Sequence, residues 1–103
     1  MIKRMVMFSL PEGTDPDEFW RYWQEGHVPD VLKLPGLKKY TINRVAKVIT
    51  GEARFWGFAE TWWDSEQAMY QAFSSPLGKS CNEDFFGRVT GILAAILEEK
   101  VNR

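Results

Sequence analysis

The chain of 103 residues is long enough for one domain and too short for two, so we expect a single domain over residues 1–103. Its 45% hydrophobic and 26% charged residues exclude a disordered chain, and its 15% aromatic residues require a packed core, a pocket lining or an interface. The 13 basic and 14 acidic residues leave a net charge of −1 and no basic stripe, which argues against binding to nucleic acid.

Residue counts and motifs limit the chemistry further. The single cysteine, Cys81, and the single histidine, His27, exclude an intrachain disulfide and a zinc site made of His and Cys. The sequence contains no glycine-rich phosphate loop, GxSxG or HExxH motif, and we expect neither a cofactor nor a metal. It has no signal-peptide pattern and no run of about 18 apolar residues, so we expect a cytoplasmic protein that does not enter a membrane.

The first predicted element is a strand over residues 2–10. Its side chains alternate, with Val6 and Phe8 on one side and Met5 and Met7 on the other. Both faces of this strand are therefore apolar.

A helix is predicted to follow this strand. Asp15 is its expected N-cap, because Pro16 fits the first helical position and Glu18 lies three residues after the cap. Pro29 has no N–H to donate, so we expect the helix to break or kink near His27.

Two strands are predicted for the middle of the chain. After the turn Leu34-Pro35-Gly36-Leu37, β-forming residues predict a strand over residues 37–49. Residues 54–63 predict the next strand, and alternation places five side chains together on one of its faces. These five are Arg54, Trp56, Phe58, Glu60 and Trp62.

The C-terminal part is predicted to contain a helix and a last strand. Asp64 and Gln67 have the spacing of a capping box, which predicts a helix over residues 64–73, and a short helical piece is expected over residues 79–86. The run Val89–Leu97 is apolar on every side and fits a buried strand or a buried helix. Element order favours a strand, because β-α-β-β-α-β is the ferredoxin-like α+β arrangement of an antiparallel sheet with helices on one face.

Apolar residues on both faces of the sheet predict a partner. The helices cover one face, yet the last strand, like the first, is apolar on both, with Ile92, Ala94 and Ile96 opposite Leu93 and Ala95. The uncovered face has to meet another sheet, and a second copy of the chain is the simplest partner. We therefore expect a homodimer in which sheet faces sheet.

His27 is the main catalytic candidate. An ordinary histidine pKa of about 6.5 allows proton transfer near neutral pH, and Asp30 is close enough in sequence to hold one ring nitrogen. In an aromatic pocket His27 would exchange protons with a carbonyl or hydroxyl substrate. The alternative is a structural role, in which the ring hydrogen-bonds a carbonyl freed by the broken helix.

Tyr40 and Glu60 are the other catalytic candidates. The Tyr40 phenol would hydrogen-bond a substrate oxygen, or else Tyr40 is an amphipathic core residue. Glu60 shares its predicted face with aromatic residues, which would desolvate the carboxylate and raise its pKa; pairing with Arg54 or Arg44 is the alternative. The candidates for an apolar substrate wall are Trp23, Trp56 and Trp62.

The segment from Phe19 to Tyr40, FWRYWQEGHVPDVLKLPGLKKY, resembles the EthD-like family of the dimeric α+β barrel superfamily. The family pattern is an aromatic-rich first helix, His-x-Pro, a Leu-Pro-Gly-Leu turn and a tyrosine that begins the second strand. The residues that match it here are Phe19, Trp23, His27, Pro29, Leu34-Pro35-Gly36-Leu37 and Tyr40. Downstream, AETWWDSEQAM resembles the family's third strand and second helix, and EEKV resembles its C-terminal strand.

This resemblance implies a ferredoxin-like fold that dimerises through its sheets. Relatives include cofactor-independent dehydratases, isomerases and aromatic cyclases, in which the histidine matching His27 is the usual acid–base candidate. The implied substrate is a small cyclic or aromatic-like compound of a degradation or secondary-metabolite pathway; the alternative is a non-catalytic ligand-binding or accessory dimer. Haem-degrading members of the superfamily carry a histidine on the second helix, which this chain lacks, so no haem is expected.

A second resemblance, to RNA-recognition motifs, rests on the same element order and on residues 54–61. Trp56 and Phe58 occupy the positions that stack on bases in those proteins. Phe55 stands where glycine is usual, Thr61 stands where an aromatic residue is usual, and the net charge is −1. We therefore expect no RNA binding, and an RNA titration with its salt dependence tests this.

Overall fold

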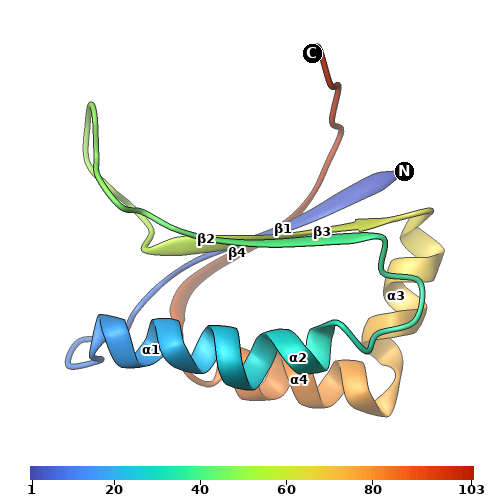
Figure 1. The fold of residues 1–103 in the computed structure, drawn as a ribbon, viewed down its shortest axis with the longest axis horizontal. Helices are drawn as coiled ribbons and strands as arrows, with labels where there is room; N and C mark the ends of the chain where they lie inside the picture. The colour runs from blue at the N-terminus through green and yellow to red at the C-terminus, as the bar shows by residue number, and fades with distance from the viewer.

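Helices and strands follow one another in the order predicted for a ferredoxin-like fold. The computed structural model describes residues 1–103 (Figure 1). In chain order the elements are β1 (Ile2–Ser9), α1 (Pro16–Tyr22), the π-helix η1 (Trp23–His27), α2 (Val28–Val31), β2 (Lys39–Arg44), β3 (Gly57–Trp63), α3 (Glu66–Ser74), α4 (Pro76–Phe86) and β4 (Thr90–Leu97). The antiparallel sheet has the strand order β2-β3-β1-β4, and all helices lie on one of its faces (Figure 1). The predicted α+β class is confirmed, including a strand rather than a helix at the C-terminal end.

Strand pairing sorts the side chains onto two faces. Arg4 lies opposite Thr61 and Val6 lies opposite Ala59 on the helix-covered face, where Val6 and Phe8 are buried. The other face, which we call the open face, carries no helix. Its side chains are Lys3, Met5, Met7, Lys39, Thr41, Asn43, Phe58, Glu60, Trp62, Leu93, Ala95 and Leu97.

Two side chains cap the helices at the ends predicted to carry caps. Asp15 Oδ1 accepts hydrogen bonds from two backbone N–H groups of the first turn of α1, at 2.9 and 3.1 Å, so the predicted N-cap is confirmed. The prediction that Asp64 caps α3 is wrong by one residue. Ser65 Oγ accepts from the backbone N–H of Ala68 at 3.1 Å, and α3 begins at Glu66.

The two middle strands are shorter than predicted. The backbone N–H of Val45 donates to the carbonyl of Trp56 at 2.9 Å, and beyond this bond the two chain segments separate. Residues 46–55 project as a loop away from the helices (Figure 1). No helix lies beneath the loop to bury its apolar residues, and Ile49 is almost fully exposed.

The helix after α3 is longer than the short piece predicted. Ser75 Oγ accepts from the backbone N–H of Gly78 at 3.1 Å, and Pro76 occupies the first turn, so α4 begins as soon as α3 ends. None of the helices is long and apolar enough to cross a membrane.

Two hydrophobic clusters fill the space between the sheet and the helices. One contains Phe8, Phe19, Trp23, Phe85 and Val89, and the other contains Val31, Leu34, Trp63, Met69, Ala72 and Cys81. The site described below lies where residues from both clusters meet.

Candidate functional site

A small cavity lies between the sheet and the helices. Its volume is about 30 Å³, which leaves room for about two water molecules. The lining comes from three strands and from η1, α2, α3 and α4. The lining residues are Arg4, Val6, Trp23, His27, Val31, Tyr40, Ala59, Thr61, Phe73, Asn82, Phe85 and Phe86. Three of the predicted site residues, His27, Tyr40 and Trp23, therefore meet at one cavity.

The π-helix η1 directs two of these side chains into the cavity. The buried residues Phe19, Trp23, His27 and Val31 repeat every four residues, whereas an α-helix has 3.6 residues per turn and would rotate this row away from the sheet. The wider turn of η1, in which a backbone N–H donates to the carbonyl five residues earlier, cancels this drift. The chain stays helical through α2, so the break predicted near His27 does not occur. The predicted alternative, an irregularity in the helix, is found there, because the π turn that ends at His27 separates α1 from α2.

His27 lies among aromatic rings and is 9% exposed. Its ring centroid is 4.6 Å from that of Phe85 and 6.4 Å from that of Tyr22. The ring makes no capping hydrogen bond to the helix, so the predicted alternative of a capping histidine does not form. Burial lowers the pKa of His27 to about 4, against the opposing effect of the Asp84 and Asp30 carboxylates. The imidazole is therefore neutral at pH 7.

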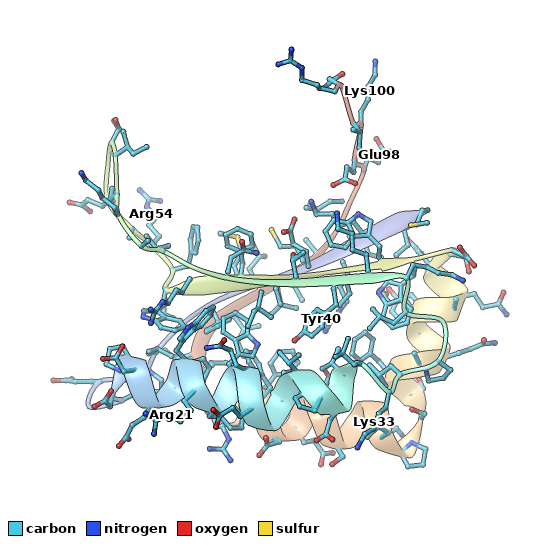
Figure 2. The ribbon with its side chains drawn as sticks, viewed as in Figure 1. Arg21, Lys33, Tyr40, Arg54, Glu98 and Lys100 are labelled. Atoms are coloured by element: carbon cyan, nitrogen blue, oxygen red, sulfur yellow. The ribbon has the colours of Figure 1, made fainter.

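Two buried polar atoms at this cavity have no hydrogen-bond partner. They are Tyr40 Oη and Trp23 Nε1. Tyr40 reaches from β2 toward the helices (Figure 2). Burial raises the pKa of Tyr40, and the neighbouring Trp23 N–H lowers it to a smaller extent, so the phenol keeps its proton at pH 7. The two groups therefore lie close together, but they do not meet with the geometry of a hydrogen bond. Each unpaired buried group costs about 1–3 kcal/mol, and an oxygen atom of a ligand would satisfy both.

Arg4 is a cavity residue that the sequence analysis did not single out. It extends from β1 on the helix-covered face, with its guanidinium carbon 4.2 Å from the ring centroid of Phe73. Burial lowers the pKa of Arg4, but a guanidinium remains charged at neutral pH. The sequence feature that could have pointed to Arg4 is its charge, because it alternates in the predicted strand with Val6 and Phe8 on a face that is otherwise apolar.

Asp84 on α4 supplies a negative charge near His27. Tyr22 Oη donates a short hydrogen bond to Asp84 Oδ2, and Arg88 Nη2 donates to Asp84 Oδ1 at 3.2 Å. The bond from Tyr22 is the main cause that lowers the pKa of Asp84, so the carboxylate is ionised at pH 7. Its charge favours the protonated form of His27. Nothing in the sequence spacing connects residue 84 to residue 27, because it is the packing of α4 against η1 that brings them near each other.

Glu60 lies on the open face, on the opposite side of the sheet from His27. The predicted pairing with Arg54 or Arg44 is wrong: Lys3 Nζ binds the Glu60 carboxylate, and Thr41 Oγ1 donates to Glu60 Oε1 at 2.9 Å. The predicted rise of its pKa is also wrong. Burial by itself would raise the pKa of Glu60, but the hydrogen bonds from Lys3 and Thr41 outweigh burial and lower it.

The three tryptophans predicted as substrate walls are separated by the sheet. Trp23 lines the cavity. Trp56 precedes β3 and packs on the helix side, with its ring 5.3 Å from that of Phe19, so the predicted shared face is wrong for this residue. Trp62 lies on the open face with Phe58. Because Trp56 and Phe58 are on opposite sides, the pair that would stack on RNA bases is not formed.

The chemistry of the cavity is that of organic acid–base groups. Its walls offer an imidazole, a phenol, an indole N–H, a guanidinium and an amide. No group of three or more His, Cys, Asp or Glu side chains is placed to share a metal ion. Cys81 is a buried free thiol, and burial raises its pKa. The arrangement can hold a ligand oxygen and exchange a proton with the neutral His27 ring.

Comparison with known proteins shows the family of this chain. Residues 11–85 match the family model of the EthD domain. The chain belongs to the EthD family. An EthD family protein from Bacillus halodurans has a similar crystal structure, with 26% sequence identity, a TM-score of 0.83, and coverage of 97% of this chain and 99% of that one. His27, Tyr40 and Trp23 fall within the EthD match, and Arg4 precedes it.

Two more distant structures share the fold of this EthD protein. One is a dimeric ferredoxin-like protein of unknown function from Thermobifida fusca, with 15% identity, a TM-score of 0.74, and coverage of 95% of this chain and 90% of that one. The other is SnoaB, a cofactor-independent oxygenase from Streptomyces nogalater, with 13% identity, a TM-score of 0.71, and coverage of 98% and 94%. At these identities the likeness concerns the fold alone.

Proposed function

We propose that this EthD protein binds a small carbonyl or hydroxyl compound in the cavity and that His27 moves a proton to or from it. The observation that carries the proposal is a buried, neutral imidazole beside two unpaired donors, Tyr40 Oη and Trp23 Nε1. A neutral imidazole accepts a proton, and buried donors stabilise the negative charge that then develops on a ligand oxygen.

A cyclic β-hydroxy ketone illustrates the reaction. His27 takes a proton from the carbon next to the carbonyl, and the negative charge moves to the carbonyl oxygen, which Tyr40 and Trp23 hydrogen-bond. The enolate then expels the hydroxyl group, which takes the proton from His27 and leaves as water while a C=C double bond forms. Dehydration, isomerisation and cyclisation share the first step, and its balance requires no cofactor.

The test follows the dehydration of 3-hydroxycyclohexanone to cyclohex-2-enone by ultraviolet absorbance. His27→Gln is expected to lower the rate by about 10²-fold or more, and Tyr40→Phe by about tenfold, because the first removes the base and the second removes a donor. Arg21→Gln on the exposed side of α1 is the control and keeps the wild-type rate. A His27→Gln protein that turns over at the wild-type rate would overturn the proposal.

The size of the cavity favours a second candidate, a binding protein without catalysis. A volume of about 30 Å³ does not hold a ring, so for either candidate side chains have to move apart before a cyclic ligand enters. A site that is not shaped in advance around the reacting atoms favours binding without catalysis. In this case cyclohex-2-enone binds to the wild-type protein, His27→Gln changes its affinity, and no dehydration is observed above the uncatalysed rate.

We further infer that the open face meets the open face of a second copy. Leu93 on this face is 54% exposed and lies opposite Met7 of β1, and β3 and β4 add further apolar side chains to the face. The loop that carries Arg54 and the tail that carries Glu98 and Lys100 project on the same side of the sheet (Figure 2). These two segments would flank a partner sheet.

Sedimentation velocity tests the dimer. Leu93→Asp is expected to convert the dimer to a monomer, because it places a charge in the apolar interface. Leu32→Asp is the matched control, since Leu32 is 61% exposed on the helix side of the molecule, and it keeps the dimer. A wild-type protein that is monomeric at micromolar concentration would contradict the inference.

A further inference from the structure

We propose that the site takes a small organic anion, a carboxylate attached to an apolar body, and that Arg4 is the residue that selects it. This inference rests on the proposed function in one respect, namely that the ligand binds in the cavity that contains His27. It does not rest on the proton transfer, and the two fail in different experiments.

Arg4 is a cation without an anionic partner. The ion pairs of the protein engage other cations, namely Lys3, Lys33, Lys38, Arg44 and Arg88. Arg4 instead stacks on Phe73, and the titratable groups that act on it are the phenols of Tyr40 and Tyr70. Arg4 is partly buried, and a charged side chain that loses part of its hydration is normally paired, because desolvation of a lone charge is costly. An unpaired guanidinium in a cavity wall therefore indicates an anion that comes from outside the chain.

Arg4 lines two neighbouring hollows of the protein. It lines the small cavity that contains His27, and it also lines a groove of about 390 Å³ between α3 and β4. The rest of the groove is mainly apolar. Its other lining residues are Met69, Tyr70, Ala94, Ala95 and Ile96. A carboxylate on Arg4 would therefore lie at the inner end of the groove and beside the cavity, with the apolar part of the ligand in the groove.

The inferred dimer would not supply the missing partner. Arg4 pairs in register with Thr61 and Ile96 on the helix-covered face, and the inferred dimer uses the opposite face. The lining of the cavity and the groove contains no second cation, so one negative charge is matched and the two charges of a phosphate are not. These facts favour a monocarboxylate.

Anion binding at Arg4 is coupled to His27. The charge of Arg4 adds to burial in lowering the pKa of His27, whereas Asp84 and Asp30 act in the opposite direction. A bound carboxylate neutralises Arg4 and leaves the two acidic groups, so it raises the pKa of His27. By linkage, protonation of His27 strengthens anion binding by the same factor.

The experiment compares 3-phenylpropanoate with 3-phenylpropanamide, which has the same shape and no charge. The chain has a single histidine, so its Hε1 signal in proton NMR reports on His27 without ambiguity. At pH 7 the wild-type protein is expected to bind the carboxylate at least about tenfold more tightly than the amide. The carboxylate is expected to raise the pKa of His27 by about one unit, and the amide to leave it unchanged.

Variants identify the residue responsible. Arg4→Gln is expected to abolish the preference for the carboxylate, and Arg4→Lys to keep part of it, because lysine retains the charge without the planar fork. The control Arg21→Gln keeps the full preference, since Arg21 is exposed on α1. If Arg4→Gln does not fold, the comparison of the two ligands on the wild-type protein and on Arg4→Lys decides.

Three results would overturn the inference: equal affinity for the two compounds, no binding of either up to about 10 mM, or a preference that survives in Arg4→Gln. The proposed function fails separately. An anion preference that depends on Arg4, together with unchanged turnover in His27→Gln, would remove the acid–base role and keep the anion site. Turnover that depends on His27 without any anion preference would do the reverse.

Discussion

Acidification is expected to destabilise this protein through His27. Burial lowers the pKa of this group from 6.5 to about 4 in the folded protein. Between these two values the unfolded chain binds a proton that the folded protein does not bind, so the free energy of unfolding falls as the pH falls. Above the unfolded pKa the ring is neutral in both states and has no effect, and below the folded pKa the full cost is reached.

The magnitude follows from the two pKa values. Their difference, 6.5 − 4, corresponds to about 3.4 kcal/mol at about 1.36 kcal/mol per pKa unit. Between about pH 7.5 and pH 5, proton binding to the unfolded chain accounts for about 2 kcal/mol of this. The fold lowers the pKa values of Asp84 and Glu60, so these carboxylates reduce stability mainly at lower pH. The window above about pH 5 therefore isolates His27.

Urea unfolding followed by tryptophan fluorescence measures this effect at several pH values. The wild-type protein is expected to lose about 2 kcal/mol across the window, and His27→Gln is expected to lose less than about 0.5 kcal/mol. The comparison uses the slope against pH, so any constant effect of the substitution on packing cancels. Parallel slopes for the two proteins would show that the folded protein binds the proton as readily as the unfolded chain, and the reasoning about a buried neutral ring would be refuted.

Four further substitutions test particular positions. Ser65→Ala is expected to cost about 1 kcal/mol in urea unfolding because it removes the N-cap of α3, whereas Asp64→Ala changes stability by less than about 0.5 kcal/mol; equal effects would contradict the assignment of the cap. Gly78→Ala is expected to cost about 2 kcal/mol or more, because the added Cβ would lie 2.2 Å from the carbonyl oxygen of Ala72, and an unchanged urea midpoint would disagree. Glu60→Gln is expected to keep the wild-type rate of 3-hydroxycyclohexanone dehydration, since Glu60 lies across the sheet from His27; a tenfold loss of rate would place it in the mechanism.

The order of the elements could be predicted because its signals are local. Alternation and turn residues located the strands, and the Asp15 cap fixed the start of α1. The facing of side chains around Trp56 could not be predicted, because residues on both faces of this segment are apolar. Trp56 lies outside the regular strand, and its backbone N–H donates to the carbonyl of Phe8 at 2.8 Å. Strict alternation therefore does not apply to it.

The candidate site was predicted only in part, for a related reason. His27 and Tyr40 were found through residue type and spacing, and the cavity brings them together. Glu60 was predicted as a site residue because alternation places it on the same strand face as aromatic residues. Alternation does not say which face of the sheet the helices cover, and Glu60 lies on the face that they leave open. Arg4 lies in the predicted apolar row of the first strand. A charged residue in such a row indicates a functional role only when the structure shows whether it has an ion-pair partner.

A histidine with a low pKa suits a site that also contains an unpaired arginine. In the unliganded protein, burial and the charge of Arg4 keep His27 neutral, so the protein avoids the cost of placing a second positive charge near the partly buried Arg4. A carboxylate on Arg4 removes that positive field, and Asp84 and Asp30 then favour the protonated ring. The pKa of His27 rises toward the range in which an imidazole is an effective base near pH 7. Ligand binding thereby increases the basicity of the group that acts on the ligand, which accounts for a lone arginine in a row of otherwise apolar side chains.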